Sequence, residues 1–411
     1  MNLDAQTYKT VTEAVAGLDR WLDSMRLPAP LYCGACYGGP VAHWWGDCLE
    51  YTGPGLDWRY EGIILGYLNL WGATNESRWM AKAKRAGDDL VAGQLPSGNY
   101  RNSEFELNPG AGGTPHEAAC DLGLLKLAEA LRSLGDPDWE IYYRTARRNL
   151  EAFYIGRLWD ENTCSFRDDP AVASFVPNKA ATLAEALFVL SHLSGEAVWA
   201  ERYALPTLNA VLEHQVSGGA LDGAIYQNSF GRRKIEKFFP YYISRCTGGL
   251  LEGLAWSGDK RFAGAVRRAS GFILRVRYED GSFPQVLYPG GRVNRYPQWV
   301  AAVGDILRAL DLSRSVGLTC DGTPSLRWLL AGRLPNGAFR TAAGFGRVTP
   351  GGAADDPRDE LPVVGWNDKA FRYLAGILAA QPAQNSQADH RKEHDSREIE
   401  VGFDPGLAGP H

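Results

Sequence analysis

The feature that most constrains this 411-residue chain is a turn-rich segment that recurs six times. Most copies place Gly or Asn shortly before an aromatic residue, which is the chemistry of a tight turn or a short hairpin. The copies recur about every sixty residues, the length of one supersecondary unit in a repeat fold. They read CGACYGGPVAHWWGD, LPSGNYRNSEFELNPGAGG, WDENTCSFRDDPAVASF, SGGALDGAIYQNSFG, YEDGSFPQVLYPGGR and LPNGAFRTAAGFGRVTPGG.

Two stretches with helical spacing of apolar residues accompany each copy. The first of each pair carries charged residues on one face, as a surface helix does. The second is apolar on nearly every side and rich in Gly and Ala, which is typical of a buried helix. The predicted helices cover 6–26, 57–72, 76–94, 116–134, 137–158, 178–194, 196–216, 241–257, 259–277, 295–316, 324–333 and 366–380.

Six surface helices around six buried ones are the simplest closed arrangement that covers every apolar face. An open solenoid would need polar caps, and neither terminal pair is more polar than the others. We therefore predict an all-α fold, an (α/α)6 toroid or six-hairpin barrel with short β-hairpin-like loops on one face. It forms a single domain over residues 1–380, and the polar, charge-rich residues 381–411 are predicted to be a disordered tail.

Composition limits the possible partners and the location. The chain is 45% hydrophobic and carries a net charge of -5, and it has no long basic run, so nucleic acid is not predicted to bind. The N-terminus has no signal-peptide pattern, and no apolar run is long enough for a membrane span. These observations predict a cytoplasmic protein.

The seven cysteines are scattered and odd in number, which argues against a disulfide framework. Cys33, Cys36, His43 and Cys48 have a spacing loosely like that of a zinc knuckle. The spacing is wider than a knuckle requires, and the intervening Gly and Trp favour a loop, so no metal is predicted. Motifs for nucleotide binding or a nucleophile elbow are absent from the sequence, and no cofactor is predicted.

Polar and aromatic residues gather where each buried helix begins. In the predicted toroid all six starts open on one face, beneath the turn-rich loops. Carboxylates and amides at a single start would only cap the helix, but Arg and Lys there oppose the helix dipole, so the set predicts a pocket. Its members are Asp57, Trp58, Arg59, Tyr60, Glu61, His116, Glu117, Asn178, Lys179, Glu185, Tyr241, Tyr242, Arg245, Arg295, Tyr296, Gln298, Trp299, Trp366, Asn367, Asp368 and Lys369.

This mixture of side chains suits a sugar. Aromatic faces stack on C–H groups, while guanidinium, amide and carboxylate groups bind hydroxyls. Helix N-termini and nearby cations also favour an anionic group, which a uronic acid supplies. The cations are Arg59, Lys179, Arg245, Arg295 and Lys369.

Over residues 1 to about 380 the pattern resembles the six-hairpin toroid enzymes of carbohydrate metabolism. These include glycoside hydrolases, uronate-directed hydrolases and lyases, and sugar epimerases. The resemblance implies a carbohydrate-active enzyme with its active site on the loop face, and a small-molecule or oligosaccharide substrate. It does not fix the reaction, because one fold serves many chemistries.

The candidate residues fit two reaction types. Hydrolysis requires two carboxyl groups, or one acting through water. Its candidates are Asp57, Glu61, Glu117 and Asp368, with Glu104, Glu106 and Asp222 as loop acids. Elimination or epimerisation requires a base such as His or Tyr and groups that neutralise a carboxylate. Its candidates are His116, Tyr241, Tyr242, Asn178 and Arg245.

Two further classes remain open. Isoprenoid cyclases and prenyltransferases also use α-toroids lined by aromatic residues that stabilise carbocations. The stretch AADDPRDE offers Asp355, Asp356, Asp359 and Glu360 for a diphosphate and magnesium, although Pro357 favours a solvated acidic loop. A non-catalytic glycan-binding toroid is the other class, and it predicts binding without turnover.

Overall fold

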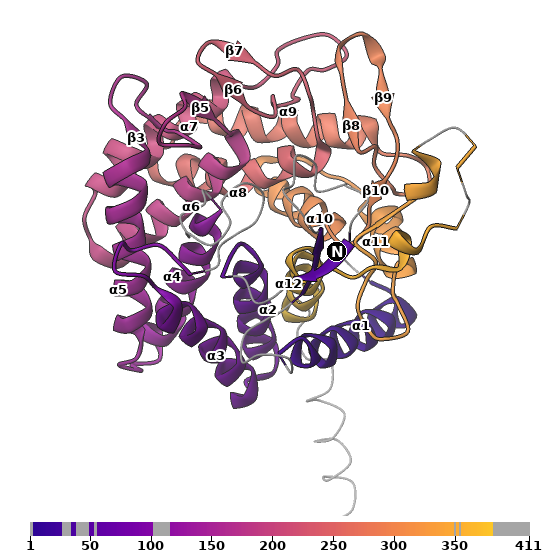
Figure 1. Ribbon diagram of the computed structural model, residues 1–411, viewed down its shortest axis with the longest axis horizontal. Coiled ribbons are helices and arrows are strands. Elements are labelled where there is room, and N and C mark those ends of the chain that lie inside the picture. Colours follow the sequence, from indigo (N-terminus) through magenta and orange to yellow (C-terminus); the bar gives the residue numbers. More distant parts are fainter. Residues whose placement is uncertain are drawn as a thin grey trace, which may run out of the picture.

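The computed structural model describes residues 3–26, 34–37, 49–52, 56–101, 116–348, 351–352 and 355–380, and its helices form two concentric rings (Figure 1). The surface helices are α1 (Ala5–Ser24), α3 (Ser77–Gly93), α5 (Trp139–Asn149), α7 (Leu205–Glu213), α9 (Lys260–Val276) and α11 (Thr323–Ala331). The inner helices are α2 (Arg59–Thr74), α4 (Glu117–Ser133), α6 (Pro177–Ser194), α8 (Pro240–Ser257), α10 (Val303–Leu312) and α12 (Val364–Ala380).

The inner helices form a closed ring. Each packs against the next in chain order, and α12 packs against α2, so the last hairpin meets the first. Because the ring closes, each inner helix has another inner helix on both sides. The structure confirms the predicted (α/α)6 toroid.

The two kinds of helix differ as their sequences predict. In α9 the buried residues fall on one side of the helix, and the Asp259 carboxylate caps its start by accepting a hydrogen bond from the backbone N–H of Arg261 at 2.8 Å. In α8 nearly every residue of the first three turns is buried. Helix α8 ends at Gly258, whose φ of 70° is the left-handed conformation that glycine adopts readily.

Glycine lets the inner helices approach closely. A Cβ atom on Gly66 of α2 would overlap the ring of Phe371 on α12. Likewise, a Cβ on Gly249 of α8 or on Gly304 of α10 would collide with the backbone of the neighbouring inner helix. Small residues at these crossings therefore set the diameter of the ring.

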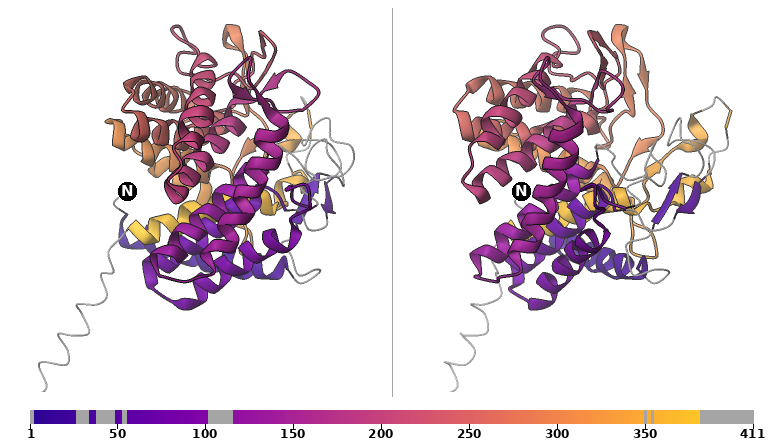
Figure 2. Two further views of the ribbon diagram at one scale, coloured as in Figure 1. Left: turned by 90° about the vertical axis from the view of Figure 1, so that its left-hand side faces the viewer. Right: turned by 60° about the vertical axis from the view of Figure 1, so that its left-hand side comes forward.

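Short antiparallel strands lie toward one end of the helices (Figure 2). Strand β5 (Ser174–Phe175) pairs with β6 (Ser229–Phe230), which pairs with β7 (Arg233–Lys234). The other pairs are β1 (Gly34–Tyr37) with β2 (Leu49–Thr52), β3 (Trp159–Asp160) with β4 (Ser165–Phe166), β8 (Val286–Leu287) with β9 (Val293–Asn294), and β10 (Gln298–Trp299) with β11 (Ala342–Ala343).

Several helices have irregular extensions. A π-helix, η1 (Leu150–Leu158), continues α5, and a second, η2 (Trp199–Ala204), leads into α7. One 3-10 turn, η4 (Ser313–Val316), continues α10. Three others lie in loops, η3 (Pro289–Gly291), η5 (Phe345–Arg347) and η6 (Pro357–Glu360).

One predicted boundary is wrong. The helix predicted over 295–316 begins at Val303, because β10 pairs with β11 and holds the preceding chain extended. Arg295, Tyr296, Gln298 and Trp299 therefore lie in a loop before α10 and not in its first turn. The other predicted helices are present, with ends that differ by a few residues.

Some predictions fall outside what the structure describes. His43, Cys33, Cys48 and the tail 381–411 are not among the described residues, and Cys36 is described only as part of strand β1. The domain boundary at residue 380 therefore stays a prediction. Within the described ranges, the His, Cys, Asp and Glu side chains include no group of three or more placed to hold a metal ion. None of the described helices has the length and apolar character needed to cross a membrane.

The close approach of α2 and α12 can be tested by replacing glycine with alanine at two separate positions of α2. Gly66→Ala should lower the free energy of unfolding by about 1–3 kcal/mol, because its methyl group would overlap the fully buried Phe371 ring. The control Gly72→Ala should raise stability by up to about 1 kcal/mol, because no neighbouring atom lies within 4 Å and Ala favours the helix. Chemical denaturation measures both, and equal effects would contradict the packing.

Candidate active site

An aromatic cluster lies where the inner helices begin. It comprises Trp58, His116, Tyr241, Trp299 and Trp366, and we call these five residues the aromatic cluster. The Trp58 ring lies 4.6 Å from His116 and 6.1 Å from Trp366, measured between centroids. Trp366 in turn lies 4.3 Å from Trp299 and 5.1 Å from Tyr241. The ring of inner helices thus brings together aromatic side chains from the starts of four helices and from the loop before α10.

Trp58 fastens the start of α2 to α12. Its indole Nε1–H donates a hydrogen bond of 2.6 Å to the carbonyl oxygen of Gly365. Its own carbonyl oxygen accepts a hydrogen bond of 3.2 Å from Lys369 Nζ. A Cβ on Gly365 would lie 2.7 Å from the indole nitrogen, so the position favours glycine. The orientation of the Trp58 ring is therefore fixed by the neighbouring helix.

A buried ionic network lies one turn deeper in the ring. We use this name for Glu61 on α2, Arg245 on α8, Asp305 on α10 and Arg372 on α12. Arg245 lies 2.8 Å from Glu61 and 3.3 Å from Asp305, and Arg372 pairs with both carboxylates. Each side chain is at most 9% exposed. Two cations and two anions therefore balance inside the ring.

The network keeps its carboxyl groups ionised. Burial raises the pKa of Glu61, but the positive charges of Arg245 and Arg372 outweigh it and hold that pKa well below the usual range. Asp305 behaves in the same way, and its pKa is also lowered. Glu61 and Arg245 were predicted to act on a substrate, and the structure places both in this network.

Asp368 is a carboxyl group of a different kind. It is fully buried beside Gly62, its Oδ2 accepts a 2.5 Å hydrogen bond from Lys369, and its Oδ1 has no hydrogen-bond partner among the described residues. Burial raises its pKa to about 7, despite the opposing charge of Lys369. At neutral pH it can therefore either give or take a proton.

Three predicted site residues hold turns in place. The Glu117 carboxylate accepts hydrogen bonds from Asn149 at 2.6 Å, Asn99 at 3.1 Å and the backbone N–H of Tyr100 at 3.2 Å. Asn367 exchanges hydrogen bonds of 2.7 and 2.9 Å with the backbone of Phe339. The amide of Gln298 donates a 2.7 Å hydrogen bond to the Ser282 hydroxyl. All three are buried, and each binds one of the repeated turns, Glu117 and Asn367 from an inner helix and Gln298 from β10.

Most remaining polar members of the predicted set have partners within the protein. These internal partners reduce the capacity of the groups to bind a ligand. Asp57 pairs with Arg59 at 2.7 Å, Tyr60 donates to Asp89 at 3.0 Å, Lys179 pairs with Asp168 at 3.0 Å, and Glu185 pairs with Arg308 at 3.2 Å. Tyr296 accepts from Arg347 at 3.0 Å, and the half-exposed Arg295 lies 3.9 Å from Asp280.

Two further candidates are a tyrosine beside the aromatic cluster and an asparagine at a helix start. Tyr242 is half-buried, with its ring 5.5 Å from Tyr241. Asn178 is half-buried in the first turn of α6. Of the loop acids, Asp222 accepts a 2.8 Å hydrogen bond from Gly218 within its own turn, and Glu104 and Glu106 lie outside the described residues.

The acidic loop AADDPRDE is engaged in local contacts. Asp356 pairs with Arg358 at 2.8 Å, and Glu360 pairs with Arg340 at 3.0 Å. Asp359 accepts hydrogen bonds from the backbone N–H groups of Gly344 and Phe345. These carboxylates stabilise the loop before α12, and they do not point together as a diphosphate–magnesium site requires.

Asp305 and Arg372 were missed by the sequence reasoning. Both lie beyond the polar starts that drew attention, in stretches that are otherwise apolar. Their signal is a charged residue on an inner helix that is buried on nearly every side. Such a residue needs a partner across the ring.

Comparisons with known proteins agree on the fold. No family model and no curated protein matches this sequence. Among solved structures, an unsaturated glucuronyl hydrolase specific for heparin is similar over 94% of this chain and 98% of its own, with a TM-score of 0.63 and 15% identity. A sugar epimerase from a ruminal bacterium is similar over 91% of this chain and 98% of its own, with a TM-score of 0.68 and 13% identity. A D-mannose isomerase is similar over 92% of this chain and 99% of its own, with a TM-score of 0.66 and 14% identity. At these identities the likeness establishes the (α/α)6 fold.

The raised pKa of Asp368 makes a prediction about stability and pH. Its folded pKa of about 7 exceeds the ordinary value of 3.8, so the folded state binds more protons than the unfolded state between these pH values. The free energy of unfolding therefore falls as pH rises from about 4 to about 7. Asp368→Asn mimics the protonated acid and removes this cost. Thermal unfolding at pH 5 and pH 8 should show the variant gaining on the wild type as pH rises. A difference that stays constant, or shrinks, would contradict a raised pKa.

Proposed function

We propose that this protein is a carbohydrate-active enzyme that binds a sugar at the aromatic cluster and transfers a proton with His116. The observation that carries the proposal is the placement of an imidazole 4.6 Å from a tryptophan ring that belongs to a continuous aromatic wall. Aromatic walls of this kind bind the C–H faces of sugars. The fold shared with sugar epimerases and hydrolases supports the same class of substrate.

The engaged carboxylates favour proton transfer over hydrolysis by a carboxylate pair. Asp57 is held by Arg59, Glu61 by two arginines, and Glu117 by three N–H donors. A carboxylate whose oxygens are filled by internal donors is a poor nucleophile or base. Among the described candidates, Asp368 has a pKa that burial raises to about 7. The imidazole of His116 is the other acid–base group at the aromatic cluster, beside the Trp58 ring.

The reaction then follows from two side chains. The imidazole of His116 takes the proton from the carbon next to a carbonyl, and the electron pair moves to the carbonyl oxygen. Burial raises the pKa of Tyr241 well above its usual value, so its hydroxyl stays protonated and can donate a hydrogen bond to that oxygen. Return of the proton to the opposite face of the same carbon gives an epimer. If the proton goes instead to the former carbonyl carbon, while that carbonyl oxygen gains a proton and the hydroxyl on the first carbon loses one, the product is an isomer.

The internal ion pairs favour a neutral sugar as the substrate. Arg245, Lys369 and Lys179 were predicted to bind an anionic group, and each is paired with a carboxylate. A uronic-acid-containing oligosaccharide, as predicted from the sequence, is the second substrate class. There the proton would leave the carbon next to the carboxylate, and loss of the neighbouring O-linked group would give an unsaturated product.

Hydrolysis with Asp368 as a single acid is the second candidate reaction. The pKa of about 7 favours it, because a general acid must be protonated near the working pH. Its products are new reducing ends, with no change at the carbon beside a carbonyl.

One experiment separates these reactions. The protein is incubated in D₂O with neutral aldoses, ketoses and uronic-acid oligosaccharides, and proton NMR follows each sugar. Proton transfer predicts loss of the signal beside the carbonyl or carboxylate, with deuterium incorporated or an unsaturated uronate formed. New reducing ends without deuterium incorporation would favour hydrolysis. Binding without turnover of any sugar would overturn the enzymatic proposal.

His116→Gln should lower the exchange rate by about 10²–10⁴-fold, the usual contribution of a positioned acid–base group. The matched control is His192→Gln, because this exposed histidine lies near the C-terminal end of α6, beside Trp256. The control should exchange at the wild-type rate. An equal loss in both variants, or none in His116→Gln, would exclude His116 as the base.

A further inference from the structure

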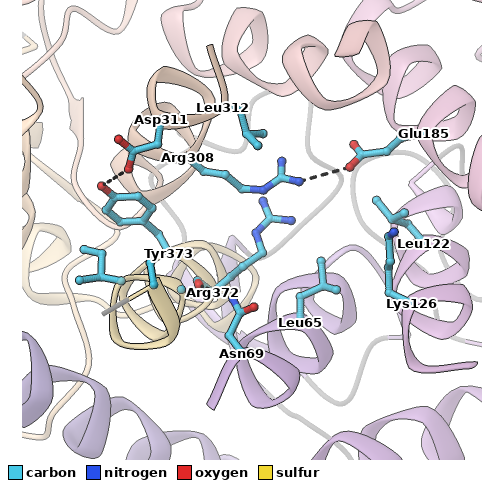
Figure 3. A pocket seen from close by; sticks show the side chains of 13 residues that line it. Leu65, Asn69, Leu122, Lys126, Glu185, Arg308, Asp311, Leu312, Arg372 and Tyr373 are labelled. Atoms are coloured by element: carbon cyan, nitrogen blue, oxygen red, sulfur yellow. Dashed lines mark hydrogen bonds and ion pairs between the residues drawn. The ribbon is translucent and has the colours of Figure 1, made fainter. Parts of the chain in front are cut away.

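A cavity opens at the opposite end of the inner ring from the aromatic cluster. It has a volume of about 420 Å³ and is lined by the later turns of α2, α4, α10 and α12 (Figure 3). The aromatic cluster lies at the helix starts, whereas the cavity residues include Asn69, Lys126, Asp311 and Tyr373. The ionic network lies between the two, and Arg372 belongs to the network and also lines the cavity. Neither reaction considered above uses this cavity.

Three cations from three helices face the cavity. Arg308, Arg372 and Lys126 line it, and Figure 3 shows the guanidinium groups of both arginines directed into it. Arg372 is 3% exposed, and its Nε–H has no hydrogen-bond partner among the described residues. Lys126 pairs with Glu129 at 2.9 Å and Arg308 pairs with Glu185 at 3.2 Å. Arg308 has five N–H donors, and this is its one hydrogen bond within the described chain, so it keeps donors for a further acceptor.

The two carboxylates that line the cavity are already paired. One oxygen of Asp311 accepts from the Tyr373 hydroxyl at 3.0 Å, and the other pairs with Arg314 at 3.2 Å. Oε1 of Glu185 accepts the Arg308 hydrogen bond, and its Oε2 lies so close to Gly248 of α8 that a Cβ there would overlap it. The cavity therefore has a surplus of charged donors, and a ligand that complements them must supply oxygen acceptors.

We infer that this cavity is a binding site for an oxyanion, a carboxylate or phosphate group, carried on a small apolar skeleton. The oxyanion lies beside the guanidinium groups of Arg308 and Arg372, with Lys126 nearby. The skeleton packs against Leu65, Leu122 and Leu312. Arg308 uses one donor on Glu185, and its remaining N–H groups can make charge-assisted hydrogen bonds to the oxyanion.

This inference does not depend on the proposed function. It rests on a cavity at the other end of the helices, and its test measures binding alone. The two can therefore fail separately.

The test is calorimetric titration of the full chain with three probes of one shape. Phenyl phosphate and benzoate carry the two oxyanions, and benzyl alcohol carries none. We expect saturable binding of one or both anions, competed by the other, and no binding of the alcohol. Preference between the two anions identifies the headgroup. Absence of binding by both anions, or equal binding of benzyl alcohol, would overturn the inference.

Variants locate the binding. Arg308→Gln should weaken the anion affinity by about tenfold or more, since it removes a charge-assisted hydrogen bond. Ala380→Trp, at the exposed last residue of α12, should block the cavity mouth without disturbing buried packing. Arg144→Gln, on the exposed face of α5, is the matched control and should bind as the wild type does. If Arg308→Gln and Ala380→Trp both bind with wild-type affinity, the anion lies elsewhere and the inference is wrong.

Discussion

The arrangement of this protein depends on the four charged groups buried at the centre of its inner ring. Glu61, Arg245, Asp305 and Arg372 come from four different inner helices, and each is ion-paired within the ring. Leaving one such charge without its partner would cost about 3–5 kcal/mol. Each helix must therefore present one particular face to the centre. This requirement fixes how the helices are rotated, and so it fixes which side chains meet at their starts.

The loops are tied to the ring by a recurring device. Glu117, Gln298 and Asn367 lie at or before the starts of three inner helices, and each binds a turn of the repeated type. The same sequence feature, a polar residue where an apolar helix begins, thus has a structural role at these positions. At Trp58, His116 and Trp366 the corresponding positions carry rings, and those rings form the aromatic cluster. The repeated unit thus forms the fold, and the residues that differ between its copies form the candidate active site.

The fold could be read from the sequence because its signals are local and repeated. Turn chemistry, helical periodicity and the alternation of surface and buried helices each recur six times, and a closed double ring is the simplest arrangement that covers every apolar face. The helix predicted over 295–316 was placed too early, because the pairing of Trp299 with Ala342 depends on a strand more than forty residues away. The ionic network could not be predicted from the sequence, for a different reason. Glu61 and Arg372 are separated by 311 positions, and their meeting depends on ring closure and helix rotation. Sequence spacing alone indicates neither.

The most direct test of this account is a crystal structure of the protein soaked with the sugars that bind it best. The account predicts that the sugar ring stacks on Trp366 or Trp299, within hydrogen-bonding distance of His116 and Tyr241. A sugar bound outside the aromatic cluster, with these residues left uncovered, would contradict the central claim that the inner-helix starts form the active site.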